Sequence, residues 1–365
     1  EMCIRDRPKD LASKLTPYIE SHDYIKIVET LREYLEKVDE KTFDYIAKLF
    51  EKEAHDLEAG TSIYLFKVDG LSITPVAKAK VSGTVRDQFA IEEKDGYFIV
   101  ATTVREFIFR IERYKIKPVP VIEKRGIVVI ISEPGKTVTY TYTPPKITIT
   151  KTKPKEIAVG VWFYPGRELW NNVYVLKLPD LKIVAKLEGI AKNERIYAAR
   201  LVGDILYFVT YRRVDPLFAV DLSDPEHPKI LGYLKMPGYS EYLHPLSKEY
   251  LLGIGIEDMP RGIKISLINV SNPKNMSEVS KIVISPGWSR VFYDYHAFLL
   301  DRKHNLVLFP GESRTIMVIE DGTKKVIEKG GVHVIKIDPN SMKLGYINYL
   351  DHPGALRQIY IDDII

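Results

Sequence analysis

Residues 194–238 read ERIYAARLVGDILYFVTYRRVDPLFAVDLSDPEHPKILGYLKMPG, a stretch in which four short, β-rich runs are separated by turn residues. The runs cover 196–202, 205–211, 218–222 and 229–235. Gly203-Asp204 predicts a tight turn between the first two, and the polar segment 223–228 predicts a turn between the last two. The stretch therefore predicts four strands in order, folded into one sheet.

The same order of strands and turns recurs along the chain. A second copy has strands at 241–246, 250–256, 263–270 and 279–284, and a third has them at 294–300, 305–309, 332–337 and 344–350. A fourth copy is split, with strands at 88–91 and 97–102 and then at 173–178 and 182–187. Four-stranded units that repeat at roughly 40–50 residues are typical of β-propellers, because each unit forms one blade.

The predicted fold class is all-β, a β-propeller with a short helical segment before it. It has four complete four-stranded blades plus two half blades, so the propeller is incomplete. The first half blade has strands at 62–69 and 73–81, which match the last two strands of a blade, and 355–365 match the first two strands of another. We assign 59–365 to the propeller, and we expect missing blades to be supplied by a full-length chain.

The first 58 residues lack this repeat. Residues 1–9 are expected to be non-native or disordered. Residues 10–58 have a helical period, with Leu11, Leu15 and Ile19 one turn apart. Ser21 and Asp39 are the predicted N-caps of two or three short helices. We expect this segment to pack on the propeller; the alternative is a partner-binding arm.

Two segments interrupt the repeats. A strand-rich insertion at about 104–170 splits one blade, and in it 137–143 alternates Thr with Val or Tyr. It forms either an exposed two-stranded arm, which we favour because such alternation suits pairing, or a stalk. In the third copy, Asp321-Gly322 predicts an extra hairpin.

Composition excludes several classes of partner and site. The 365 residues carry a net charge of +4, with both signs mixed along the chain rather than gathered in a basic stripe, so nucleic acid is not an expected partner. No apolar run approaches the roughly 18 residues of a membrane span. Cys3 is the only cysteine, which rules out an intrachain disulfide and a thiolate metal cage.

Acidic residues in one blade give the candidate metal site. Asp215, Asp221 and Asp224 offer carboxylate oxygens, the ligands that Ca²⁺ prefers, and calcium is the only cofactor that the motifs suggest. The alternative is that aspartates in these turns bond to their own backbone. His244 and His296 likewise form either a metal-binding pair near the channel or buried structural histidines.

Aromatic residues and two sequons give the candidate binding and modification sites. Trp162, Tyr164 and Trp170 either contact a sugar or a proline-rich peptide, or anchor the insertion on its blade. Asn269 and Asn275 head N-x-S sequons and are glycosylation acceptors if the chain is exported.

Several stretches resemble one family. They are 194–204, 214–225, 242–246, 251–255 and 87–89 with 101–103. These residues are similar to those of archaeal and bacterial secreted proteins with a C-terminal β-propeller distantly related to WD-type repeats. The chain departs from that family in Tyr-Asp-Tyr-His-Ala-Phe at 293–298, where the family has Tyr-Asp-His-Lys-Ala-Phe, and in the long insertion. The resemblance implies a propeller and an extracellular or cell-surface location, and it assigns no reaction.

The predicted function is a non-catalytic scaffold, at the cell surface or secreted, that binds protein or polysaccharide. The chain contains no G-x-S-x-G, H-E-x-x-H, Walker or G-x-G-x-x-G motif that opens a helix. The alternative is a propeller-type hydrolase or lyase with its active site at the channel mouth and a dependence on calcium. That alternative predicts carboxylates and a histidine gathered at one end of the channel with shifted pKa values.

Overall fold

The computed structural model describes residues 9–21, 23–53, 60–114, 158–211, 215–318 and 324–359. The chain divides into two compact units, one of Glu1–Leu57 with Phe107–Pro165 and one of Glu58–Glu106 with Gly166–Ile365. Each unit is described by itself. The predictions for 1–8, for the alternating stretch 137–143 and for the turn at 321–322 lie outside the described residues.

The first unit is a small helical core. Its helices are α1 (Lys9–Ser21), α2 (Tyr24–Leu35) and α3 (Glu40–Glu53). Their apolar faces share one core with the distal ends of two strands: Leu11, Leu15, Ile27, Leu31, Leu35, Phe43, Ile46, Ala47, Ile111, Val159 and Val161. Arg113 fastens the strand end to the helices, because its guanidinium donates to the carbonyl of Val38 at 2.6 Å and lies 4.3 Å from the ring centre of Phe43.

The helix caps agree with the sequence at one position and differ at another. Asp39 caps α3, since its Oδ1 accepts from the backbone N–H of Thr42 at 2.9 Å. The predicted cap Ser21 is wrong, because it is the last residue of α1. Asp23 takes its place at the start of α2 and accepts from the N–H of Lys26 at 3.0 Å.

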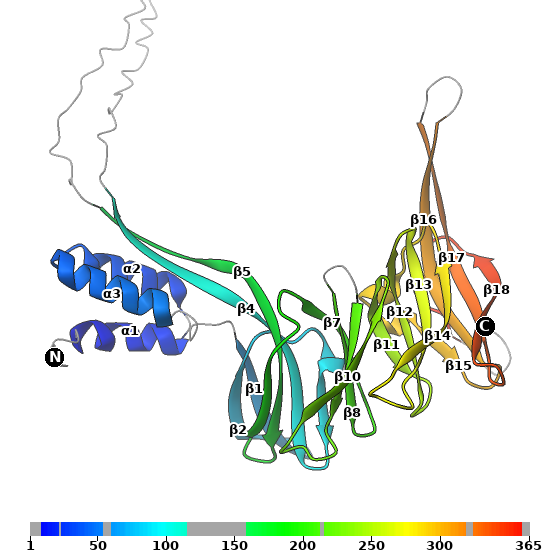
Figure 1. Cartoon of the computed structure of the whole chain (residues 1–365), viewed down its shortest axis with the longest axis horizontal. Helices are drawn as coiled ribbons and strands as arrows, with labels where there is room; N and C mark the ends of the chain where they lie inside the picture. Colours follow the sequence, from blue (N-terminus) through cyan, green and yellow to red (C-terminus); the bar gives the residue numbers. More distant parts are fainter. Residues whose placement is uncertain are drawn as a thin grey trace, which may run out of the picture. The chain divides into compact units, whose positions relative to one another are not determined.

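The second unit consists of four four-stranded antiparallel sheets and one two-stranded sheet, which follow one another in Figure 1. This arrangement confirms the predicted all-β propeller blades. The strands are β1 (Gly60–Asp69), β2 (Ser72–Ser82), β3 (Ile91–Lys94), β4 (Tyr97–Tyr114), β5 (Ala158–Lys177), β6 (Lys182–Ile190), β7 (Arg195–Val202), β8 (Ile205–Tyr211), β9 (Asp215–Asp221), β10 (Lys229–Met236), β11 (Tyr239–Pro245), β12 (Tyr250–Asp258), β13 (Arg261–Asn269), β14 (Ser277–Ile284), β15 (Leu299–Asp301), β16 (Leu306–Val318), β17 (Lys324–Asp338) and β18 (Lys343–Asp351).

The blade of β7–β10 lies between two other blades and packs on both faces, which explains why its central strands are apolar almost throughout. Along β8, Leu206 and Phe208 enter the core shared with the preceding blade, whereas Tyr207 and Val209 enter the core shared with the following one. Side chains of a strand point alternately to opposite faces, so consecutive apolar residues serve two different cores. The first strands of the blades lie next to one another, with β7 beside β11.

Two predicted first strands are largely 3₁₀ turns. Residues 88–91 were expected to be a strand, but Gln88–Ala90 form a 3₁₀ helix, η3, because the side chain of Asp87 accepts from the N–H of Phe89 at 2.9 Å. Likewise Asp294 accepts from the N–H of His296 at 3.2 Å and starts the 3₁₀ helix η5, Tyr295–Ala297. The predicted strand at 294–300 therefore shrinks to β15. A further 3₁₀ helix, η4, precedes it at Arg290–Phe292.

The links between second and third strands differ in length. The β12–β13 link turns directly from Asp258 to Arg261. By contrast, β16 and β17 stay paired as far as Val318 and Lys324, so the predicted extra hairpin is a continuation of these two strands. β4 and β5 are lengthened in the same way, and their far ends belong to the helical unit.

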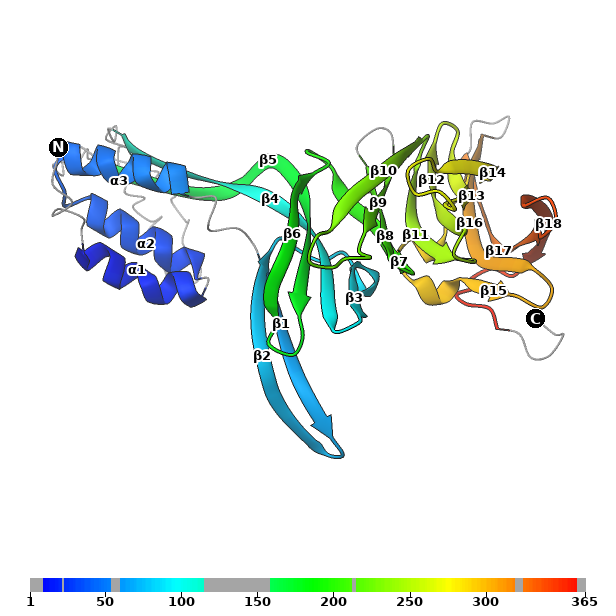
Figure 2. The ribbon, with the colours of Figure 1, turned by 60° about the horizontal axis from the view of Figure 1, so that its bottom comes forward.

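The β1–β2 hairpin is the predicted first half blade. Its inner face, with Ile63, Leu65, Ala77 and Ala79, packs on the blade that contains β4 and β5. Figure 2 shows the hairpin projecting beyond the sheet formed by β3 to β6. At the other end of the chain, 355–359 form no strand, and 360–365 lie outside the described residues. Among the described helices, none is long and apolar enough to cross a membrane.

Candidate functional site

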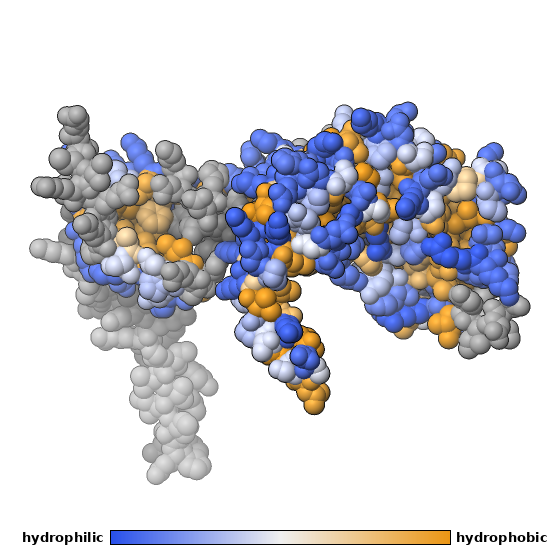
Figure 3. All heavy atoms as spheres, turned by 90° about the horizontal axis from the view of Figure 1, so that it is seen from below, coloured by the Kyte–Doolittle hydropathy of each residue, from blue (hydrophilic) through white to orange (hydrophobic). Residues whose placement is uncertain are grey.

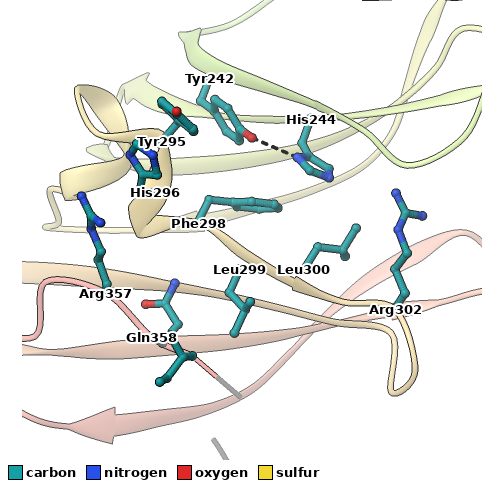
Figure 4. A pocket seen from close by; sticks show the side chains of 11 residues that line it. Tyr242, His244, Tyr295, His296, Phe298, Leu299, Leu300, Arg302, Arg357 and Gln358 are labelled. Atoms are coloured by element: carbon teal, nitrogen blue, oxygen red, sulfur yellow. Dashed lines mark hydrogen bonds between the residues drawn. The ribbon is translucent and has the colours of Figure 1, made fainter. Parts of the chain in front are cut away.

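A pocket of about 570 Å³ lies beside β11, the first strand of its blade (Figure 4). A volume in the range of ~300–1,000 Å³ is usual for ligand pockets. Three separate parts of the second unit line it: Tyr242 and His244; Tyr295, His296, Phe298, Leu299, Leu300 and Arg302; and Arg357, Gln358 and Ile359 of the tail after β18. The pocket therefore exists only in the folded chain.

Aromatic rings form its walls. The ring of Phe298 lies 5.3 Å from that of Tyr242 and 4.6 Å from that of His244. Phe89, from η3, joins this cluster with its ring 4.9 Å from Tyr295 and edge-on to it. Arg200 of β7 packs on this cluster, because its guanidinium lies 3.7 Å from the ring centre of Phe89. Residues from four blades thus fix the aromatic positions.

His244 is an uncharged member of the pocket. Its Nδ1 lies 2.9 Å from the hydroxyl of Tyr242. Burial, followed by the positive charges of Arg200 and Arg302, lowers the pKa of His244 to about 4. At neutral pH the imidazole is therefore neutral. In the tautomer whose Nδ1 accepts the Tyr242 proton, Nε2–H is left as a donor.

Two guanidinium groups stand at opposite ends of the pocket in Figure 4. Arg302 donates to the backbone carbonyl of Leu246 at 3.1 Å, and no described carboxylate forms an ion pair with it. Arg357 lies 3.3 Å from Oδ2 of Asp294. Burial acts to raise the pKa of Asp294, but hydrogen bonds from His296, Arg290 and Arg357 outweigh it and lower that pKa to about 2. At the Arg357 end, the positive charge is thus balanced by the ionised carboxylate of Asp294. At the Arg302 end, no described carboxylate balances the positive charge.

Carboxylates also gather near the start of the inner strands. Arg86 bridges two blades, since it pairs with Glu241 at 3.0 Å and donates to the carbonyl of Tyr197 at 3.3 Å. Burial raises the pKa of Glu241, and burial likewise raises the pKa of the neighbouring Asp87. Two carboxyl groups beside one arginine, both with raised pKa values, mark this position as chemically distinct.

The predicted calcium ligands are spread along one strand and its turn. Asp215 begins β9 and Asp221 ends it, so about 20 Å of extended chain separates them. Asp221 accepts from the N–H of Ser223 at 2.9 Å and pairs with Lys229 at 3.4 Å. Asp224 accepts from the N–H of Glu226 at 3.2 Å. Within the described residues, no three His, Cys, Asp or Glu side chains are grouped to hold a metal ion.

The predicted aromatic contacts lie along β5 but not in one unit. Trp162 and Tyr164 are exposed and belong to the helical unit, and the ring of Tyr114 lies 6.3 Å from that of Trp162. Trp170 is half-buried in the propeller unit. Of the two sequons, Asn275 is exposed in a turn, whereas the side chain of Asn269 accepts from the N–H and the hydroxyl of Ser271.

Sequence reasoning reached part of the pocket. It singled out His244 and His296, and the structure brings both to the same cavity. It missed Arg302 and Arg357, which belong to no motif, and it named Phe298 only as the last residue of the family stretch 293–298. Only their positions in the repeat could have indicated them. Phe298 and Arg302 flank the first strand of a repeat unit, and Arg357 follows the Pro-Gly that closes that unit.

A comparison with protein families matches residues 18–360 to a model described as a beta propeller domain. An uncharacterized protein of Methanocaldococcus jannaschii is 31% identical over 369 residues, which cover 98% of this chain and 49% of that protein. An uncharacterized protein of Archaeoglobus fulgidus is 40% identical over 171 residues, which cover 46% of this chain and 27% of that protein. The chain thus spans about half and about a quarter of these two relatives.

Two solved structures are similar to part of the chain. One is Chaetomium thermophilum Sqt1 bound to the N-terminus of the ribosomal protein L10, with 12% identity, coverage of 51% of this chain and 59% of that one, and a TM-score of 0.31. The other is the beta-propeller domain of Myceliophteria thermophila Cps50 (Swd1), with 12% identity, coverage of 51% and 68%, and a TM-score of 0.28.

Proposed function

The chain belongs to the beta propeller domain family, and we propose that it is a non-catalytic scaffold that binds a protein partner. The observation that carries this proposal is the pocket beside β11. Its aromatic residues are fixed by residues of four blades, and the tail after β18 adds Arg357, Gln358 and Ile359 to its lining. A rigid pocket of aromatic and arginine side chains suits the anchoring of a partner side chain, since these residue types dominate binding energy at interfaces.

A second surface supports a protein partner. On the outer face of β1–β2, Tyr64, Phe66, Val68 and Ile73 are all more than half exposed, at 55%, 51%, 67% and 67%. Figure 3 shows apolar surface along this projecting hairpin. Apolar surface that is contiguous and exposed is a common mark of interaction sites.

We further propose that additional strands extend the blade to which β1–β2 belongs. In every complete blade the strand that corresponds to β1 is the third one and pairs with the second strand as well as the fourth, whereas β1 pairs only with β2 among the described strands. An apolar face on a terminal unit of a repeat array is what a neighbouring unit covers.

The site of action that we propose is the cell surface or the extracellular space, as the family resemblance implied. Polysaccharide remains a second class of ligand at Trp162, Tyr164 and Trp170, and glycosylation is proposed at Asn269 and Asn275. A protease added to intact cells that express the native gene is expected to digest the protein. Full protection in intact cells, with digestion after lysis, contradicts this location.

The scaffold is tested by placing a photo-crosslinking amino acid at a single site. Tyr295 lines the pocket, and Tyr233, 56% exposed on β10, is the control position outside it. With an extract of the native cell envelope, we expect a discrete protein adduct from position 295 and not from 233. The partner identified in that adduct is then purified, and its affinity for the chain is expected to fall in Phe298→Ala. Absence of an adduct at 295, or equal adducts at both positions, contradicts the proposal.

One observation favours an enzyme as a second candidate. Asp87 and Glu241 have raised pKa values beside Arg86, which is the kind of environment that a general acid requires. A hydrolase or lyase would use these carboxyls on a substrate held at the inner strands, and Asp221 and Asp224 would hold calcium at the edge of the blade. Turnover of a glycan or peptide panel that is abolished in Asp87→Asn and Glu241→Gln, but kept in Glu249→Gln, supports the enzyme. Turnover that survives in both variants rejects this site.

A further inference from the structure

We propose that the pocket beside β11 takes an extended, acidic segment of a partner protein, with a carboxylate on Arg302 and the backbone along the free edge of β15. This inference rests on the proposed scaffold function and names the chemistry of its ligand. Three features of the described residues carry it: an unmatched guanidinium, apolar walls and an unpaired strand edge.

The charge of the pocket favours an anion. Among the residues that line it, two are arginines and none is acidic, and of the two histidines His244 stays neutral at pH 7. The guanidinium of Arg302 donates two hydrogen bonds, to the backbone carbonyls of Leu246 and Pro245, at 3.1 and 3.5 Å. A guanidinium carries five N–H donors, so the remaining donors are available for a carboxylate. The ion pair that Arg302 lacks within the described chain is thus one that a ligand can form.

The walls favour an apolar group beside that anion. Phe298 stacks near His244, and Leu299 and Leu300 continue the surface towards Arg302. A purely polar anion such as phosphate would leave these side chains uncovered. A peptide in which acidic and apolar side chains alternate satisfies both features, because successive side chains of an extended chain point to opposite sides.

The strand edge singles out a peptide. β15 pairs with β16 on one side and with no described strand on the other, so the backbone groups on that edge are unpaired by any described strand, and its residues Leu299 and Leu300 line the pocket. An extended peptide can add to such an edge by backbone hydrogen bonds. A polysaccharide offers no matching ladder of N–H and C=O groups, and for this reason a protein segment is the occupant.

The test uses fluorescein-labelled peptides with alternating glutamate and valine, and fluorescence polarisation as the readout. Three comparison probes isolate the features: the same peptide with glutamine for glutamate, the same peptide N-methylated at alternate backbone positions, and polygalacturonate as an acidic polysaccharide. The variants are Arg302→Ala and Arg302→Lys in the whole chain. Lys274→Ala, an exposed lysine in the β13–β14 turn, is the matched control.

The acidic peptide is expected to bind the wild-type chain, and binding is expected to weaken about tenfold in Arg302→Ala, since the charge-assisted hydrogen bonds to the carboxylate are lost. Arg302→Lys should lie between the two, because lysine keeps the charge and loses the bidentate geometry. Lys274→Ala should bind as the wild type does. The glutamine and N-methylated peptides should each bind about tenfold more weakly than the acidic peptide.

Two outcomes overturn the inference: equal binding of the acidic and glutamine peptides, or an affinity that is unchanged in Arg302→Ala. Preferential binding of polygalacturonate that depends on Arg302 also overturns it. Circular dichroism spectra of all variants establish that they fold. If the crosslink at position 295 persists while the peptide does not bind, only the inference fails. If neither occurs, the proposed scaffold function fails with it.

Discussion

Replacing His333 with glutamine is expected to reduce the pH dependence of stability in the propeller unit. His333 lies on β17, is 6% exposed, and is held by the Tyr346 hydroxyl 3.0 Å from its Nδ1 and by the ring of Tyr349 at 5.0 Å. Burial lowers the pKa of His333 from 6.5 to about 4. The folded chain therefore keeps the imidazole neutral over a range in which the unfolded chain protonates it.

The direction and size follow from proton linkage. As the pH falls below 6.5 the unfolded state binds a proton at this histidine first, so the free energy of unfolding decreases until the pH reaches about 4. A shift of about 2.5 pKa units corresponds to about 3 kcal/mol at most. At pH 7 glutamine is expected to cost about 1–2 kcal/mol, because it fills less of the space against Phe309 and Tyr349. Towards pH 4 this deficit should disappear and then change sign, because the wild type loses up to about 3 kcal/mol over this range and the variant does not.

The assay is urea unfolding at pH 7 and at pH 4.5, followed by circular dichroism. Asp87 and Glu241 have raised pKa values, so the folded state binds protons at these groups before the unfolded state does, and they add stability as the pH falls. This contribution is the same in the wild type and in His333→Gln. The difference between variant and wild type therefore isolates position 333. His352→Gln, at an exposed residue, is the control and should follow the wild type. A constant difference between His333→Gln and the wild type at the two pH values would refute the reasoning.

Three further variants test the packing. Gly255→Ala is expected to destabilise the propeller unit by about 3 kcal/mol or more, because a Cβ there would lie 1.9 Å from the backbone oxygen of Tyr239; a melting temperature within a degree or two of the wild type would contradict this. Lys264→Ala removes the partner of Glu278 from a position that is 1% exposed, and is expected to cost about 3–5 kcal/mol in urea unfolding, more than Lys274→Ala. Phe66→Ser on the projecting hairpin should leave the melting temperature unchanged, since this side chain is 51% exposed, and should weaken binding of the partner protein identified by crosslinking; equal binding would show that the hairpin face is not part of the interface.

Much of the blade architecture could be predicted from the sequence because turns and apolar runs are local signals. The strands at 205–211 were predicted to the residue, and Gly203-Asp204 was recognised as the turn before them. The residues 88–90 and 295–297 could not be placed, because their apolar content fits a strand. There a single aspartate side chain, Asp87 or Asp294, bonds to a backbone N–H two residues on and turns the chain.

The residues of the candidate site are far apart in the sequence, and no local sequence pattern indicates that they meet in the folded chain. His244 and His296 stand in different blades at different offsets, and only the packing of first strands against one another brings them to one pocket with Arg302 and Arg357. The same holds for Arg86 and Glu241, which form an ion pair across 155 positions of sequence. Both are common surface residue types, and it is the burial of Glu241 in the folded chain that raises the pKa of its carboxyl group.

The sequence by itself determined the repeat, because alternation and turn chemistry act over a few residues and each blade carries them in full. Only the tertiary structure decided which residues share the pocket, why His244 stays neutral and which guanidinium lacks a carboxylate. These properties depend on desolvation and on charges supplied by neighbouring blades, and both arise only when the blades pack.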